Sequence, residues 1–121
     1  MIRADTKKDI SRGDFAKAYN VDGVVFLGYH AKEGAPNGVL SHTYNSKELQ
    51  YVKLNGMSIG ELYVDSRIFA DMGIKSIFHA GDDVSVAEMN SICPHTVTVI
   101  IRQGKKLRRA PRKRGCTPRY L

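Results

Sequence analysis

The stretch Val24-Val25-Phe26-Leu27-Gly28-Tyr29-His30 decides the fold expected for this chain. Its apolar residues run without interruption and then give way to a glycine. A short apolar run bounded by a turn residue predicts a strand buried on both faces, which suits a central position in a parallel sheet covered by helices. His30 then lies where this strand ends and a loop begins, and loops held on a rigid scaffold often carry function.

The segments that follow alternate between strand and helix patterns. Glycine and proline predict a loop over 31–38, and Asn55-Gly56 is a strong tight-turn signal. In chain order the further expected elements are a hairpin whose first arm is 49–54, a helix from 58 to 72 that Gly73 ends, a strand over 74–79, a helix over 84–90 and a central strand over 96–101. This alternation predicts an α/β fold, with a mostly parallel sheet layered between helices as an α/β/α sandwich.

Length and composition are those of an ordinary globular domain. The 121 residues are 42% hydrophobic and 26% charged, and a chain of this size buries roughly two thirds of its unfolded surface. No apolar run approaches the roughly 20 residues of a membrane helix, and the N-terminus lacks the apolar centre of a secretory signal. We therefore expect a cytoplasmic domain without membrane contact. Cys93 and Cys116 are expected to be unpaired thiols.

The positive charge is concentrated at one end of the chain. The net charge is +7, yet residues 1–88 hold 10 basic and 12 acidic side chains, whereas residues 89–121 hold 9 basic and no acidic ones. We divide the chain into an α/β domain over 1–104 and a basic tail over 105–121, whose prolines and missing apolar face predict disorder in isolation. The nearly neutral body gives no broad surface for nucleic acid, so such a partner would bind only through the tail.

Two histidines and a carboxylate lie at the edges of predicted elements. His30 ends the first strand, His42 follows the glycine-bearing loop, and Glu61 lies near the start of the first predicted helix. These residue types hold zinc and act on a bound water. Their spacing alone is weak evidence, since it is not a compact pattern that places two ligands on one helical face. For Glu61 the alternative is a capping-box pair with Ser58, which the residues by themselves favour.

Asp82 and Asp83 follow the second predicted strand. Paired carboxylates favour cations, and the alternative is an N-cap for the next helix, the usual role of aspartate at a strand-to-helix turn. His79 matches no motif and is expected to be a core or surface group. Alternation along the first strand turns Tyr29 away from His30, so Tyr29 is expected to serve packing.

Four motifs occur in a fixed order along the chain. They are Phe-Leu-Gly-Tyr-His-Ala at 26–31, Gly-Val-Leu-Ser-His at 38–42, Asn-Gly-Met-Ser-Ile-Gly-Glu at 55–61 and Ala-Gly-Asp-Asp at 80–83. In this order and at these intervals they resemble the D-aminopeptidase family of binuclear zinc peptidases. The resemblance runs from about residue 2 to about residue 103, and four ordered motifs are far more specific than any one of them.

The resemblance implies a role for individual residues. His30, in the family's Gly-Tyr-His motif, would be a zinc ligand and Glu61 a second, while His42 would be the catalytic histidine beside the metals, acting as base or nucleophile. Asp82 and Asp83 would border the site in a supporting role. The implied activity is removal of N-terminal residues, D-amino acids among them, from short peptides. It would use two zinc ions in a homo-oligomer that encloses its active sites.

The same resemblance implies a partial site. The family's Asp-x-Glu pair and a histidine in an Asp-Ser-His motif fall before Met1, nothing around Asp5 replaces them, and the sequence departs from the family in the basic tail. We therefore expect an incomplete sandwich, impaired activity and weak zinc binding, as in the product of a disrupted reading frame. The alternatives are a non-catalytic remnant whose tail binds nucleic acid or another polyanion, and a fragment that folds only with a partner supplying the absent strand.

Overall fold

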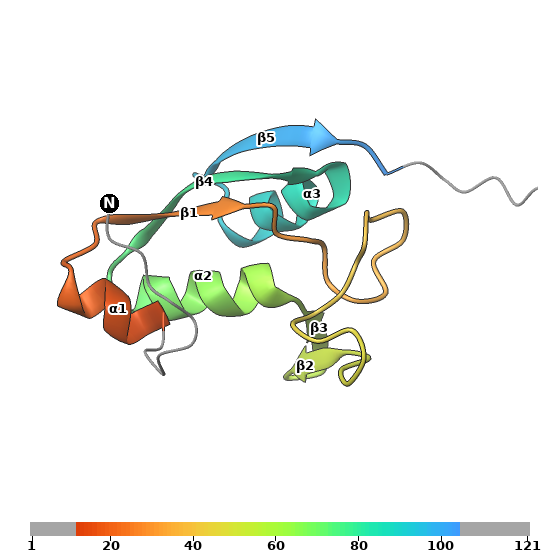
Figure 1. Cartoon of the computed structure of the whole chain (residues 1–121), viewed down its shortest axis with the longest axis horizontal. Helices are drawn as coiled ribbons and strands as arrows, with labels where there is room; N and C mark the ends of the chain where they lie inside the picture. The colour runs from red at the N-terminus through yellow and green to blue at the C-terminus, as the bar shows by residue number, and fades with distance from the viewer. Residues whose placement is uncertain (1–11, 105–121) are drawn as a thin grey trace, which may run out of the picture.

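A computed structural model describes residues 12–104 of the chain (Figure 1). In chain order its elements are α1 (Arg12–Ala18), β1 (Gly23–Leu27), β2 (Val52–Leu54), β3 (Met57–Ile59), α2 (Glu61–Asp71), β4 (Lys75–Asp82), α3 (Asp83–Ile92) and β5 (Val97–Arg102). The predicted α/β class is confirmed. The basic tail over 105–121 and Cys116 lie outside the described residues, and Cys93 is a free thiol.

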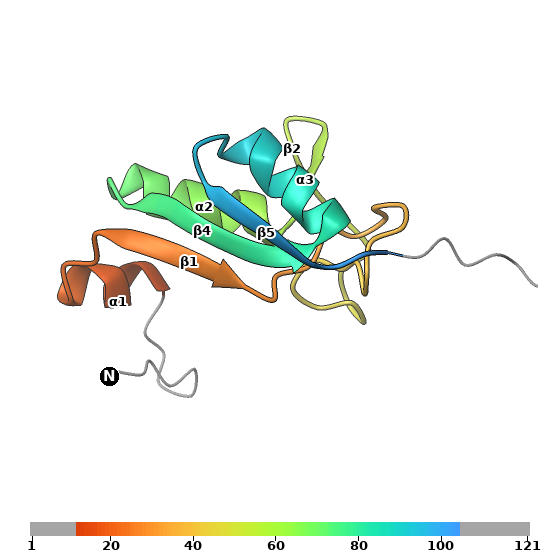
Figure 2. The same ribbon diagram turned by 90° about the horizontal axis from the view of Figure 1, so that it is seen from above.

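A parallel sheet of three strands organises the described part of the chain. Its order is β1-β4-β5, with β4 paired to a parallel neighbour on each side (Figure 2). β2 and β3 form a separate antiparallel hairpin. The strands predicted over 24–30 and 96–101 were expected in central positions, and within residues 12–104 both predictions are wrong, because β4 takes the centre and β1 and β5 lie at the edges.

The helices bury one face of the sheet. α3 packs against β4 and β5, and α2 packs against β4 and α3, so that both lie beneath the sheet in Figure 1. The core cluster takes residues from β1, from every helix and from the residue before β4, namely Ala16, Phe26, Leu62, Phe69, Ile74 and Met89. The Phe26 ring meets the rings of Tyr29 and Phe69 edge-on, with centroids 5.1 and 6.4 Å apart. Aromatic pairs in this geometry add about 0.5–1.5 kcal/mol to the burial of their area.

The opposite face of the sheet is apolar and uncovered within residues 12–104. The strand register places the partners of Phe78 and Ala80 on this face. These partners and one further residue of β5 have side chains between 44 and 66% exposed: Val25, Leu27, Val97, Val99 and Ile101. Parallel sheets are normally covered on both faces. The prediction that the first strand is buried on both faces is therefore wrong for the described residues, which contain one of the two helical layers of the expected sandwich.

Glycine and asparagine at positive φ fix the two predicted turns. Asn55 and Gly56 have φ of 50° and 81°, so the β2–β3 hairpin turns as the Asn-Gly pair predicts. Gly73 has φ of 77° and directly follows the residue that caps α2. Both predictions are confirmed.

Several element boundaries differ from the sequence prediction, among them the start of β2 at Val52 rather than at residue 49 and the start of α2 at Glu61 rather than at residue 58. β1 ends at Leu27, because Gly28 leaves the strand with φ of 70°, and His30 therefore lies in the loop beyond it. β4 continues to Asp82, past the predicted end at residue 79, because β5 pairs with it as far as that residue. α1 was not predicted, although an acidic residue in its first turn and a basic one in its last suit a short helix.

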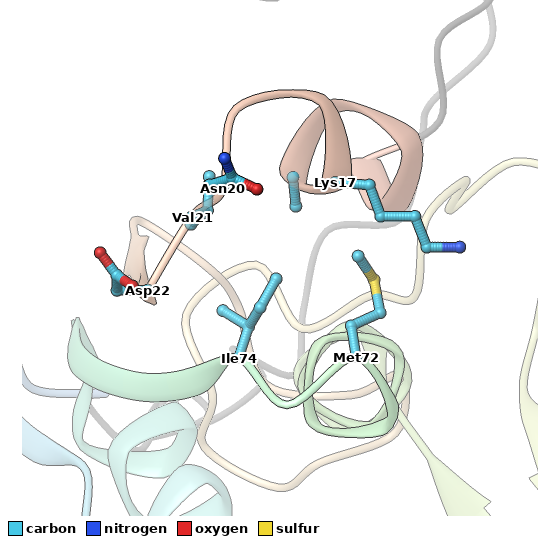
Figure 3. Close-up of a pocket in the computed structure, with 7 residues that line it drawn as sticks. Lys17, Asn20, Val21, Asp22, Met72 and Ile74 are labelled. Carbon is cyan, nitrogen blue, oxygen red and sulfur yellow. The ribbon is translucent and has the colours of Figure 1, made fainter.

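A hollow of about 370 Å³ lies between α1, the start of β1 and the C-terminal end of α2 (Figure 3). Its lining side chains include Lys17, Asn20, Asp22 and Met72. It is at the opposite ends of β1 and α2 from His30 and Glu61, so it belongs to a different part of the molecule. No helix within residues 12–104 has the length and apolar character to cross a membrane.

His79 is fully buried in β4, so the prediction of a core or surface group is resolved as core. Its Nδ1 lies 3.3 Å from the carbonyl oxygen of Phe26 and its Nε2 lies 3.3 Å from the Ser85 hydroxyl. Burial lowers the pKa of His79, and the Phe26 carbonyl and the charge of Asp82 oppose that shift. The neutral imidazole is therefore the form that the fold favours.

This lowered pKa predicts a loss of stability in acid. The contribution of His79 is present above its unfolded pKa of 6.5 and is lost as the pH falls through the folded value, because the unfolded chain then binds the extra proton. Urea unfolding between pH 7.5 and 5 should show a slope of up to about 1.4 kcal/mol per pH unit from this group. His79→Gln should reduce the slope, whereas His95→Gln, at an exposed histidine, should not. Equal slopes in wild type and His79→Gln would contradict the assignment.

Candidate functional site

Residues 28–45 form an irregular segment that carries both histidines, and we call it the histidine loop. Because it has no helix or strand, some of its backbone amides bond within the loop, as His42 N does to the Ala31 carbonyl, and others need partners from elsewhere. Three carboxylates from the helical layer and the end of β4 supply them. Val39 N donates to Asp82 at 2.6 Å, Lys32 N donates to Glu88 at 3.0 Å, and Tyr44 N donates to Glu61.

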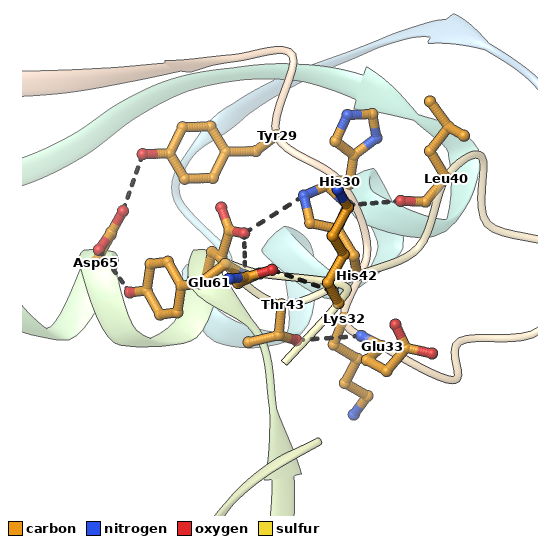
Figure 4. A network of polar contacts seen from close by, with 12 residues as sticks. Tyr29, His30, Lys32, Glu33, Leu40, His42, Thr43, Glu61 and Asp65 are labelled. Carbon is orange, nitrogen blue, oxygen red and sulfur yellow. Dashed lines mark hydrogen bonds and ion pairs between the residues drawn. The ribbon is translucent and has the colours of Figure 1, made fainter. Parts of the chain in front are cut away.

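Backbone carbonyls of the same loop orient both imidazoles, and Figure 4 shows the contact between His42 and Leu40. Nδ1 of His30 lies 2.9 Å from the Val39 carbonyl oxygen, and Nδ1 of His42 lies 2.7 Å from that of Leu40. A carbonyl oxygen only accepts, so each Nδ1 carries the proton and each Nε2 of the neutral ring keeps a lone pair. The ring centroids are 4.9 Å apart. The loop thus presents two basic nitrogens close together.

Glu61 is the first residue of α2, and its carboxylate faces the histidine loop. Oε1 accepts from the Tyr44 amide and lies 3.7 Å from His42 Nε2. The capping-box alternative is wrong, because Gly60 is the N-cap and makes no side-chain cap bond, while Ser58 pairs with Lys53 inside the hairpin. A carboxylate in the first turn still interacts favourably with the positive end of the helix dipole.

Asp82 caps α3, as the alternative for this residue predicted. Its Oδ1 accepts from Ser85 N at 2.6 Å while its Oδ2 accepts from Val39 N in the histidine loop. Asp83 accepts from Gly104 N at 2.9 Å and so fixes the chain just after β5. Asp82 therefore borders the site through the loop backbone. The supporting role that the resemblance gives to both residues stays a prediction.

The sequence did not predict that Tyr29 and Tyr44 would bond to Asp65 beside the site. The Tyr29 hydroxyl donates to one oxygen of Asp65 at 2.9 Å (Figure 4), and the Tyr44 hydroxyl donates to the other at 3.0 Å. Tyr29 also packs edge-on against Phe26, so the packing prediction for it is confirmed but incomplete. The usable signal was spacing, because Asp65 lies four residues after Glu61 and therefore on the same face of α2.

Glu88 and Gly60 allow the segment after His30 to lie close to α3 and to the start of α2. Burial raises the pKa of Glu88, and the hydrogen bond from the Lys32 amide opposes that shift. A Cβ at Gly60 would lie 2.7 Å from the Cβ of Lys32 and 3.0 Å from its Cα. The segment after His30 therefore runs directly over the residue before Glu61, an approach that only glycine permits.

The donor atoms match part of a zinc site. Two imidazole nitrogens and a carboxylate are ligand types that zinc takes in catalytic centres, and bonding of each Nδ1 to a carbonyl is the usual arrangement behind a metal-binding Nε2. Within residues 12–104, however, no three His, Cys, Asp or Glu side chains lie close enough to hold a metal ion. The described residues thus fit zinc as a partial ligand set.

Comparison with known proteins gives consistent matches. The family model of the D-aminopeptidases matches residues 9–110. A D-aminopeptidase of Bacillus subtilis (strain 168) is 30% identical over 81 residues, which are 67% of this chain and 29% of that protein. The solved structure of Zn-dependent D-aminopeptidase DppA from Bacillus subtilis, a self-compartmentalizing protease, aligns with a TM-score of 0.63 and 29% identity, covering 69% of this chain and 30% of that one. The chain thus spans about three tenths of the length of these relatives.

The capping geometry predicts a contrast between two small substitutions. Asp82→Ala removes the N-cap of α3 and leaves the Val39 amide without its acceptor, so we expect a loss of about 1–3 kcal/mol in the free energy of unfolding. Ser58→Ala removes no cap, so we expect a change below about 0.5 kcal/mol. Urea denaturation at neutral pH measures both. A loss for Ser58→Ala as large as that for Asp82→Ala would restore the capping box.

Proposed function

Because the chain belongs to the D-aminopeptidase family, we propose that it forms part of a zinc-dependent aminopeptidase that removes N-terminal residues from short peptides. The observation that carries the proposal is the meeting of His30, His42 and Glu61, which stand at the family's motif positions, at one end of the sheet. D-amino acids are the residues that we expect it to release, since its relatives carry the name D-aminopeptidase.

His30 and Glu61 are the residues that would hold the metal. The Val39 carbonyl engages Nδ1 of His30 and leaves Nε2 as the donor atom, and Glu61 offers its carboxylate from the rigid first turn of α2. Zinc, when bound, supplies polarisation of the peptide carbonyl and a bound water of lowered pKa. Asp82 supports the arrangement by holding Val39 in place through its amide.

His42 would move the proton. With Nδ1–H donated to Leu40, Nε2 accepts a proton from the attacking water as its oxygen bonds to the peptide carbon. When the peptide C–N bond breaks, the same nitrogen returns the proton to the leaving amine. The Glu61 carboxylate, 3.7 Å from Nε2, stabilises the imidazolium between these steps. As a nucleophile, the alternative role, Nε2 would instead bond to the carbonyl carbon as the peptide C–N bond breaks and the amine takes a proton from water, and the resulting hydroxide would then hydrolyse the acyl-imidazole.

The relatives suggest what the described residues leave out. Since the chain covers about three tenths of their length, we assign the remaining zinc ligands to segments outside residues 12–104 and expect the isolated chain to be impaired. We also propose a cytoplasmic homo-oligomer, because the similar DppA is a self-compartmentalizing protease. Peptide substrates would then reach sites enclosed by the assembly.

Zinc binding and hydrolysis measured on the same purified 121-residue chain test this proposal. Complete protein zinc sites reach about 10–16 kcal/mol, so a partial set should give roughly half of that, a Kd between about 1 µM and 0.2 mM. We expect slow release of D-alanine from D-alanyl dipeptides, lost in His42→Ala, and weakened zinc binding in His30→Ala. His95→Ala, at an exposed histidine, is the matched control.

Two results would contradict the proposal. Hydrolysis that survives in both His30→Ala and His42→Ala would place the chemistry elsewhere. Metal-free, inactive protein that associates with a polyanion in a salt-sensitive way, through residues 105–121, would favour the non-catalytic alternative.

A further inference from the structure

Two tyrosines of the histidine loop converge on one buried carboxylate. Tyr29 directly precedes His30, Tyr44 lies two residues after His42, and both hydroxyls donate to Asp65, which is 3% exposed. We propose that Asp65 is a positioning residue that holds Tyr44 and, through the Tyr44 amide, sets the distance between Glu61 and His42. The inference rests on the proposed function in treating Glu61 and His42 as the reacting groups.

The hydrogen bonds from the two tyrosines to Asp65 are strong. Asp65 accepts one phenol on each oxygen, at 2.9 and 3.0 Å. Hydrogen bonds to an ionised carboxylate are shorter and stronger than those between neutral groups, and the low dielectric of a buried position strengthens them further. Loss of either phenol would remove a hydrogen bond from a buried carboxylate oxygen, which is costly, so Asp65 helps to hold both tyrosine side chains.

The backbone of Tyr44 is in the left-handed region, with φ of 54°. A bulky residue adopts this region only where the surrounding structure enforces it. Tyr44 is held by its hydroxyl on Asp65 and by its amide on Glu61. These contacts fix the chain direction immediately after His42, with the intervening Thr43 fully buried.

Glu61 and Asp65 belong to the same helix. Glu61 and Asp65 are one turn apart on the same face of α2, so Tyr44 bridges two points of a rigid element. Glu61 uses Oε1 for this bridge, and the same oxygen lies 3.7 Å from His42 Nε2. Releasing the phenol would therefore loosen the amide contact, and the distance between Glu61 and His42 would no longer be fixed.

The test must separate positioning from simple stability. Asp65→Ala risks unfolding the domain, so the informative variant is Tyr44→Phe, which removes one oxygen and keeps the ring. Tyr63→Phe is the matched control, because Tyr63 is a partly buried tyrosine on the same helix outside this network. Two-dimensional ¹H–¹⁵N spectra of the histidine rings report the tautomer of each imidazole, and the buried His79 serves as the internal reference.

For Tyr44→Phe we expect the Nε2 signal of His42 to shift and broaden, because its distance from Glu61 Oε1 is no longer fixed, while the Leu40 carbonyl still holds the Nδ1–H form and the His79 signals stay unchanged. If the wild type binds zinc, the zinc affinity of Tyr44→Phe should be about 10–100-fold lower, as when other residues that orient a metal ligand are replaced. Tyr29→Phe leaves the Tyr44 contact in place and should alter His42 less. Tyr63→Phe should match the wild type in both measurements.

The inference is overturned if His42 in Tyr44→Phe keeps the wild-type spectrum while the thermal midpoint falls, because the network would then serve stability alone. It is equally overturned if Tyr63→Phe produces the same change as Tyr44→Phe. A wild type that binds no zinc would count against the proposed function, but the His42 Nε2 signal would still decide whether Asp65 positions the site.

Discussion

The site depends on carboxylates that hold the backbone of an irregular loop. Residues 28–45 contain no helix or strand, yet they hold the imidazole rings of His30 and His42 with their centroids 4.9 Å apart. The amides of Lys32, Val39 and Tyr44 achieve this by donating to acidic side chains on α2, on α3 and at the end of β4. Together with backbone bonds inside the loop, such as that from His42 N to the Ala31 carbonyl, these bonds stand in place of the ladder that a regular element would supply.

The same arrangement explains why the loop lies where it does. In a parallel sheet with helices on its face, the C-terminal ends of the strands and the N-terminal ends of the following helices meet at one edge. Glu61 and Asp82 are at such helix starts, and the loop leaves β1 at that edge. The uncovered apolar face of the sheet and the relatives' greater length indicate that the family fold extends beyond residues 12–104.

Local signals predicted the parts of this structure that local physics controls. The Asn55-Gly56 turn, the helix stop at Gly73 and the Asp82 cap each depend on neighbouring residues. The contacts that build the site join residues far apart in sequence: Tyr44 and Asp65 by 21 positions, Val39 and Asp82 by 43, and Lys32 and Glu88 by 56. No periodicity encodes such pairs, so the motif resemblance could identify His30, His42 and Glu61 but not what holds them.

Amide hydrogen exchange tests the central claim most directly, because it reads the three loop amides one by one. If carboxylates hold the histidine loop, the amides of Lys32, Val39 and Tyr44 should exchange slowly, at rates close to those of β4, although they lie in irregular chain. Exchange as fast as in an unstructured peptide at all three positions would contradict the account, because the histidines would then have no fixed placement.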